Sequence, residues 1–188
     1  HNSVAFLKAN MLIAFLFLFT TGFYVYQHST GFSWDFAVYV MNAQYFFGGY
    51  YFEWARPPLA SLVMAALGFA SLLAEYIYII AVSILHLYSS IKFADAYGIA
   101  RKPFYAFSLT PFAIISAFSV GTELFSVALL QLFLASLKCT RSGILFGLAS
   151  LLRYSNFIYI VLLAFQRNFR KISLTLALSY DVFVPWLK

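Results

Sequence analysis

Apolar runs long enough to cross a lipid bilayer follow one another along this chain, separated by short segments rich in basic residues. One covers 4–26 and is interrupted only by Lys8, and another covers 76–98. A helix of about 20 apolar residues crosses the hydrocarbon core of a bilayer. Hydrophobic residues make up 63% of the chain and charged residues 10%, whereas soluble domains have roughly 45–50% and 25%. We therefore expect an all-α, polytopic integral membrane protein.

The distribution of basic residues selects among the possible membrane topologies. The other apolar runs are 57–73, 104–121, 124–137, 143–166 and 172–187. If every run spanned the membrane, Arg101 and Lys102 would lie outside, against the positive-inside tendency. We expect instead that 57–73 lies in the outer interface and that 143–166 enters and returns as two short half-helices around Arg153. This arrangement puts nine of the twelve basic residues in the cytoplasm.

This topology divides a single transmembrane domain, 1–188, into three parts. Residues 1–27 form the first span with a cytoplasmic N-terminus, 28–75 form an outer loop with two juxtamembrane helices, and 76–188 form the remaining membrane helices. The total is about six or seven membrane helices. The chain begins with His1 and stops inside an apolar run, which is typical of a truncated or N-terminal portion of a longer protein.

The first outer loop carries an unusual set of polar residues. Ser33 is a good N-cap for a helix over about 34–47, on which Asp35, Tyr39 and Asn42 fall at i, i+4 and i+7 and share one face. The glycine pair at 48 and 49 predicts the end of this helix, and the proline pair at 57 and 58 predicts the start of a second one.

Charged residues gather on the outer face in the predicted topology. Asp35, Glu53 and Arg56 belong to the outer loop, and the turn at Glu123 faces the same side. A charge at the centre of a membrane helix costs roughly 2.5–3.5 kcal/mol, so charges kept in such a chain indicate function by default. Nucleic-acid binding is disfavoured, because no basic face is interleaved with aromatic residues. Cys139 is the chain's single cysteine and is expected to be a small apolar residue.

Short motifs in both halves of the chain resemble GT-C glycosyltransferases, most closely the protein O-mannosyltransferase and aminoarabinose-transferase-like group. The resemblance extends over nearly the whole chain. It is carried by Asp35 soon after the first span, Tyr39 and Ala43, Gly48-Gly49-Tyr50, Arg56-Pro57-Pro58-Leu59, Thr110-Pro111, Ser119, Glu123 and 143–154 (GILFGLASLLRY). The position after Asp35, which is often a second acid in the family, is Phe36 here.

The resemblance implies an inverting transfer of sugar from a polyprenyl-phosphate donor to a protein, glycan or lipid acceptor on the outer face. Asp35 would be the general base that takes the acceptor's proton, and Arg56 would stabilise the leaving phosphate. Arg153 would either contact the donor phosphate or neutralise a buried acid. Glu123 would bind the acceptor, or hold a divalent metal (Mg²⁺ or Mn²⁺) together with Asp35. The residues expected to line the site or meet the acceptor are Tyr39, Asn42, Glu53 and Glu123.

Other interpretations of the same residues remain open at this point. Asp35 would also serve as a helix cap, Glu123 as a match to a helix dipole, and Arg56 as an interfacial anchor that pairs with Glu53. A non-catalytic GT-C-like membrane subunit or lipid-binding scaffold is the main alternative function. A small transporter is a third, motivated by Arg153 and Asp181 at membrane depth.

Overall fold

The computed structural model describes residues 2–31, 34–68, 72–109, 122–139, 141–165 and 175, and within these ranges it is all-helical. This confirms the all-α part of the predicted fold class. The elements are α1 (Asn2–Thr30), α2 (Trp34–Tyr45), α3 (Leu59–Gly68), α4 (Leu72–Tyr97), α5 (Arg101–Ser108), α7 (Glu123–Ala135), α8 (Arg141–Leu152), the 3₁₀ helix η1 (Tyr154–Tyr159) and α9 (Ile160–Phe165).

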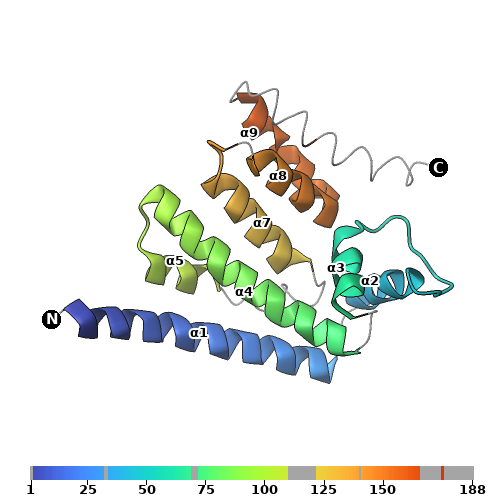
Figure 1. Ribbon diagram of the computed structural model, residues 1–188, viewed down its shortest axis with the longest axis horizontal. Helices are drawn as coiled ribbons and strands as arrows, with labels where there is room; N and C mark the ends of the chain where they lie inside the picture. Colours follow the sequence, from blue (N-terminus) through green and yellow to red (C-terminus); the bar gives the residue numbers. More distant parts are fainter. Residues whose placement is uncertain are drawn as a thin grey trace.

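Two of these helices are long and apolar enough to cross a membrane: the segment Asn10–Thr30 of α1, and α4. They run antiparallel, with the end of α1 beside the start of α4 (Figure 1). There His28 Nε2 lies 2.7 Å from Glu75 Oε2, and both side chains are buried. The other apolar helices of the described residues have 10–17 residues. Two such helices among the described residues support membrane association, and the predicted number of six or seven stays a prediction.

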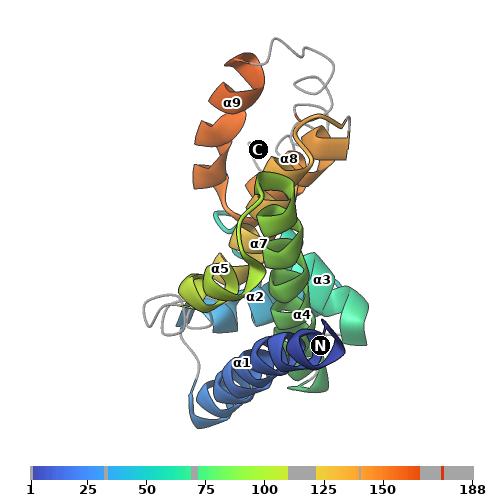
Figure 2. The same cartoon turned by 90° about the vertical axis from the view of Figure 1, so that its left-hand side faces the viewer.

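The segment predicted to be the outer loop contains two short helices, as expected. The predicted cap Ser33 lies outside the described residues, but α2 ends near Gly48, whose φ of 95° is the left-handed conformation that favours glycine. Helix α3 is shorter than the run 57–73 and does not have the length of a span. It packs between α2 and α4 at one end of α4 (Figures 1 and 2). A cluster of buried side chains joins these helices: Phe36 and Tyr39 of α2, Met64 of α3, Tyr78 of α4 and Phe125 of α7.

Helix α7 lies between α4 and α8 and is the centre of the bundle. Polar groups as well as apolar ones join it to α4, because Ser89 and Ser90 donate hydrogen bonds to Gln131 Oε1, at 2.6 and 3.2 Å. Such hydrogen bonds stabilise contacts between helices in an apolar environment.

The predicted break at Arg153 is confirmed. Helix α8 ends at Leu152, Arg153 is extended (φ −147°, ψ 118°), and η1 and α9 follow. Leu163 of α9 packs with Phe133 of α7 and Phe146 of α8, so the chain turns back along the helices it has just left. Of the predicted span 104–121, α5 covers the first residues and 110–121 lies outside the described part, as does 172–187 apart from Thr175.

Candidate functional site

A cavity of about 320 Å³ opens where α2 and the loop before α3 meet the start of α7 and the break after α8. Its walls come from four segments that are far apart in the sequence. The lining residues are Asp35, Tyr39, Arg56, Pro57, Thr122, Glu123, Leu152, Arg153, Tyr154 and Ser155. Two carboxylates and two guanidinium groups therefore face one small space.

Arg56 is the centre of the charge network on one side of this cavity. Its Nη2 forms an ion pair with Asp35 Oδ1, and its Nε lies 3.2 Å from Glu53 Oε1. Partial burial lowers the pKa of Arg56, but Asp35 and Glu53 outweigh this and raise it, so the guanidinium stays charged. A guanidinium has five N–H donors, and these two pairs leave others able to reach a ligand.

Asn42 fixes the loop that carries Glu53 and Arg56. Its side chain is fully buried, its Nδ2 donates to the Glu53 carbonyl at 3.1 Å, and its Oδ1 accepts from the Glu53 N–H at 2.7 Å. This pair of bonds satisfies both backbone groups of Glu53. Asn42 thus holds Glu53 in the position from which its carboxylate meets Arg56.

Replacing Asn42 with Ala removes both bonds and leaves the part-buried N–H of Glu53 without its acceptor. We expect the free energy of unfolding to fall by about 1–3 kcal/mol, measured by denaturation in detergent micelles and followed by circular dichroism. Gln44→Ala is the matched control, because Gln44 is an exposed amide on the same helix. Equal losses of unfolding free energy in the two variants would contradict a stabilising role for the hydrogen bonds between Asn42 and Glu53.

The other side of the cavity is an ion pair between Glu123 and Arg153. Arg153 Nη1 lies 2.7 Å from Glu123 Oε1. Glu123 is the first residue of α7, where the helix dipole favours a carboxylate. Its second oxygen, Oε2, is buried and has no hydrogen-bond partner among the described residues. This oxygen is therefore an unused hydrogen-bond acceptor on a residue that lines the cavity.

Burial raises the pKa of Glu123 above its ordinary value of 4.5, and the opposing effects of backbone N–H groups and Arg153 do not cancel the rise. The folded chain therefore binds this proton more tightly than the unfolded chain. As the pH rises above 4.5 and through the raised pKa, this carboxyl's contribution to the free energy of unfolding falls.

We expect Glu123→Gln to make thermal stability less dependent on pH between pH 4.5 and neutrality. The variant has no proton to release in that range, so its melting temperature should fall less than that of the native chain. Thermal unfolding in detergent, measured across that range, tests this. If the melting temperatures of the two proteins change in parallel with pH, the raised pKa assigned to Glu123 is contradicted.

Tyr39 lies between the two ion pairs. Burial raises the pKa of its hydroxyl, while a side-chain hydrogen bond to Thr122 and the charge of Arg56 act in the opposite direction. The hydroxyl therefore stays neutral, and it connects α2 to the residue that precedes α7.

The residues predicted from sequence occupy three kinds of position. Five line the cavity: Asp35, Tyr39, Arg56, Glu123 and Arg153. Glu53 contacts Arg56 at the edge of the cavity. Asn42 is buried behind it and holds the Glu53 backbone through two hydrogen bonds. Arg153 neutralises an acid, one of its two predicted roles, and its position in the cavity leaves the other a prediction.

Five further lining residues were not predicted as site residues: Pro57, Thr122, Leu152, Tyr154 and Ser155. All but Ser155 are adjacent in sequence to one that was, and Ser155 is two positions from Arg153. Adjacency to Arg56, Glu123 or Arg153 was therefore a signal, although the sequence does not show which neighbours turn inward.

The charges around the cavity bear on the expected divalent metal. No group of three His, Cys, Asp or Glu residues in the described ranges is placed to hold a metal ion. Mg²⁺ is bound by oxygen ligands, usually carboxylates and water, but a guanidinium lies beside both Asp35 and Glu123 and repels a cation. These residues fit a metal poorly. Metal binding stays a prediction, and no step below depends on it.

Comparisons of the chain with known protein families, with characterised proteins and with solved structures find no match.

Proposed function

We propose that this chain is a multi-pass membrane glycosyltransferase of the GT-C type, which transfers a sugar with inversion from a polyprenyl-phosphate donor to an acceptor. The observation that carries the proposal is the ion pair between Asp35 and Arg56 at the edge of a cavity that also holds Glu123 and Arg153. A base and a phosphate-binding cation are the two groups that this transfer needs, and they lie in contact.

The chemistry assigns one role to each charged group. The acceptor oxygen attacks the anomeric carbon as the Asp35 carboxylate takes its proton, and the bond from that carbon to the phosphate oxygen breaks. The leaving group is a lipid phosphate with a developing negative charge, which the Arg56 guanidinium stabilises through its remaining N–H donors. Arg153 adds positive charge on the opposite wall, and Glu123 Oε2 accepts a hydrogen bond from the acceptor.

The arrangement of basic residues supports an outer location for this site. The N-terminus of α1 and the C-terminus of α4 lie at the same end of the bundle, away from α2 and α3 (Figure 1). Four basic residues lie at or near this end of the bundle: Lys92 in the last turns of α4, Arg101 and Lys102 at the start of α5, and Arg141 at the start of α8. The positive-inside tendency makes this end cytoplasmic, and in this topology the cavity opens on the other face of a membrane crossed six or seven times.

One observation favours a second candidate, a lipid-binding subunit without catalytic activity. Asp35 and Glu123 are both already paired with arginines. If those pairs do not open when the donor binds, Asp35 cannot take a proton. Such a subunit would bind the lipid phosphate without releasing it from a sugar.

Release of free polyprenyl phosphate from a polyprenyl-phosphate sugar separates the two functions. The chain is reconstituted in liposomes with polyprenyl-phosphate mannose or aminoarabinose, and solubilised membranes of its own source supply the acceptor. A glycosyltransferase releases the lipid phosphate at a rate that depends on Asp35. Binding of the donor without any release would overturn the enzyme and favour the subunit, whereas absence of binding would overturn both.

A further inference from the structure

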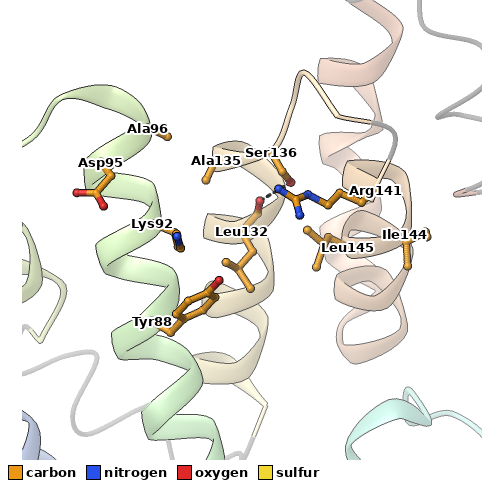
Figure 3. A pocket seen from close by; sticks show the side chains of 10 residues that line it. All are labelled: Tyr88, Lys92, Asp95, Ala96, Leu132, Ala135, Ser136, Arg141, Ile144 and Leu145. Atoms are coloured by element: carbon orange, nitrogen blue, oxygen red, sulfur yellow. Dashed lines mark hydrogen bonds between the residues drawn. The ribbon is translucent and has the colours of Figure 1, made fainter.

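A larger cavity, of about 680 Å³, lies at the other end of the bundle, between α4, α7 and α8 (Figure 3). It is remote from the site above: α7 begins with Glu123 at that site and ends at this cavity, and α8 begins here with Arg141 and ends there with Leu152. A helix of 13 residues such as α7 is roughly 20 Å long. The two cavities are therefore distinct.

The polar side of this cavity is positively charged. Lys92 of α4 and Arg141 of α8 both line it from opposite sides of the end of α7, and the Arg141 guanidinium extends toward α7 (Figure 3). The ammonium of Lys92 lies 5.6 Å from the centre of the Tyr88 ring. Asp95 also lines the cavity, but both of its oxygens accept hydrogen bonds from Arg101, at 2.6 and 2.8 Å. Because Arg101 neutralises Asp95, the charges that remain facing the cavity are those of Lys92 and Arg141.

The remaining walls are mostly apolar and partly exposed. Leu132, Ile144 and Leu145 line the cavity, and Ile144 is 44% exposed. Helix α4 has 26 residues, roughly 39 Å at 1.5 Å per residue, which is longer than the hydrocarbon core of about 30 Å. Counted from Leu72, about 20 residues cross that core, so Lys92 falls at the level of the headgroups with apolar side chains beside it.

We propose that this cavity binds an anionic phospholipid, with its phosphate between Lys92 and Arg141 and its acyl chains along Ile144 and Leu145. Basic pockets between membrane helices are suited to anionic headgroups, and the apolar wall distinguishes a lipid from a free phosphate. The site does not depend on the sugar transfer proposed above, so its test stands whether or not the chain is an enzyme.

Native mass spectrometry of the detergent-purified chain measures the binding directly. We expect phosphatidylglycerol to bind and phosphatidylcholine of the same chain length to bind much more weakly. A cation near an anionic headgroup contributes roughly a factor of five in affinity. The double variant Lys92→Gln/Arg141→Gln should therefore bind phosphatidylglycerol about 25-fold more weakly. The control Lys102→Gln/Lys138→Gln removes the same charge from the same end without altering the cavity lining, and should bind normally.

A second variant keeps all charges and tests the cavity itself. Ala96 is exposed on α4 and lines the cavity, so Ala96→Phe should obstruct part of it and reduce binding without changing the net charge. Four results would each overturn the proposal. They are an equal loss of binding in the two double variants, equal binding of the two lipids, full competition by soluble glycerol phosphate, and unchanged binding by Ala96→Phe. Circular dichroism of every variant confirms that the helices are intact.

Discussion

Replacing Asp35 with Asn should lower the turnover number of sugar transfer by roughly 10²–10⁴-fold, the usual contribution of a general base. Asn has nearly the same shape and can still face Arg56, but it cannot take the acceptor's proton. The Michaelis constant for the donor should change little, because the groups that meet the phosphate are kept. Steady-state release of polyprenyl phosphate measures both quantities.

Two comparisons make this result specific to Asp35. Asp35→Asn should bind polyprenyl phosphate as the native chain does, which shows that the cavity is intact. Asp35→Glu keeps a carboxylate and should retain more activity than the Asn variant. A native turnover number in Asp35→Asn would remove the general base from the mechanism.

Replacing Arg56 with Lys should lower turnover by roughly 10²–10³-fold, the range for losing a donor that stabilises developing negative charge. Lysine keeps the charge but loses the planar group that contacts Asp35 and Glu53 together and still has donors for a phosphate. We also expect weaker binding of polyprenyl phosphate, because Arg56 meets that group before and after the bond breaks. Kinetics and native mass spectrometry check the two effects.

Arg101→Lys is the matched control for this substitution. Arg101 also forms an Asp–Arg pair, with Asp95, but that pair is exposed and lies at the opposite end of α4. It should leave turnover and donor binding unchanged. If Arg56→Lys behaves like Arg101→Lys, Arg56 is an anchor of the loop and does not act on the phosphate.

Local features of the fold could be predicted because local chemistry decides them. The proline pair at 57 and 58 directly precedes α3, and Gly48 adopts the left-handed conformation that follows α2. The break at Arg153 was predicted because a continuous apolar helix would have placed the basic residues after it on the wrong face. For the turn and the helix start the residues that matter are close together in the sequence, and for the break the order of apolar runs and basic residues is enough.

Contacts between distant residues were harder to predict. Arg153 and Glu123 are 30 positions apart, and only the packing of α7 on α8 shows that one neutralises the other. The two hydrogen bonds from Asn42 to the backbone of Glu53 depend on how the loop folds back over α2, which no helical periodicity specifies. Sequence reasoning put Asn42 on the face of the site, whereas its buried position makes it the support of that face.

The basic residues at the far end of α4 show the same limit in another way. Lys92 and Arg141 were interpreted as topology signals, and in sequence they look like any cluster at the end of a span. Their convergence on one cavity depends on the arrangement of α4, α7 and α8 (Figure 3). A charge that orients a helix in the membrane can therefore also form a binding site.

An experimental structure of the chain with bound polyprenyl phosphate tests the central claim most directly. The account predicts a phosphate in the cavity beside Asp35, with an oxygen roughly 3 Å from a nitrogen of Arg56 and the prenyl chain leaving toward the membrane. A phosphate found at Lys92 and Arg141, with the Asp35–Arg56 pair unchanged and nothing bound beside it, would contradict it.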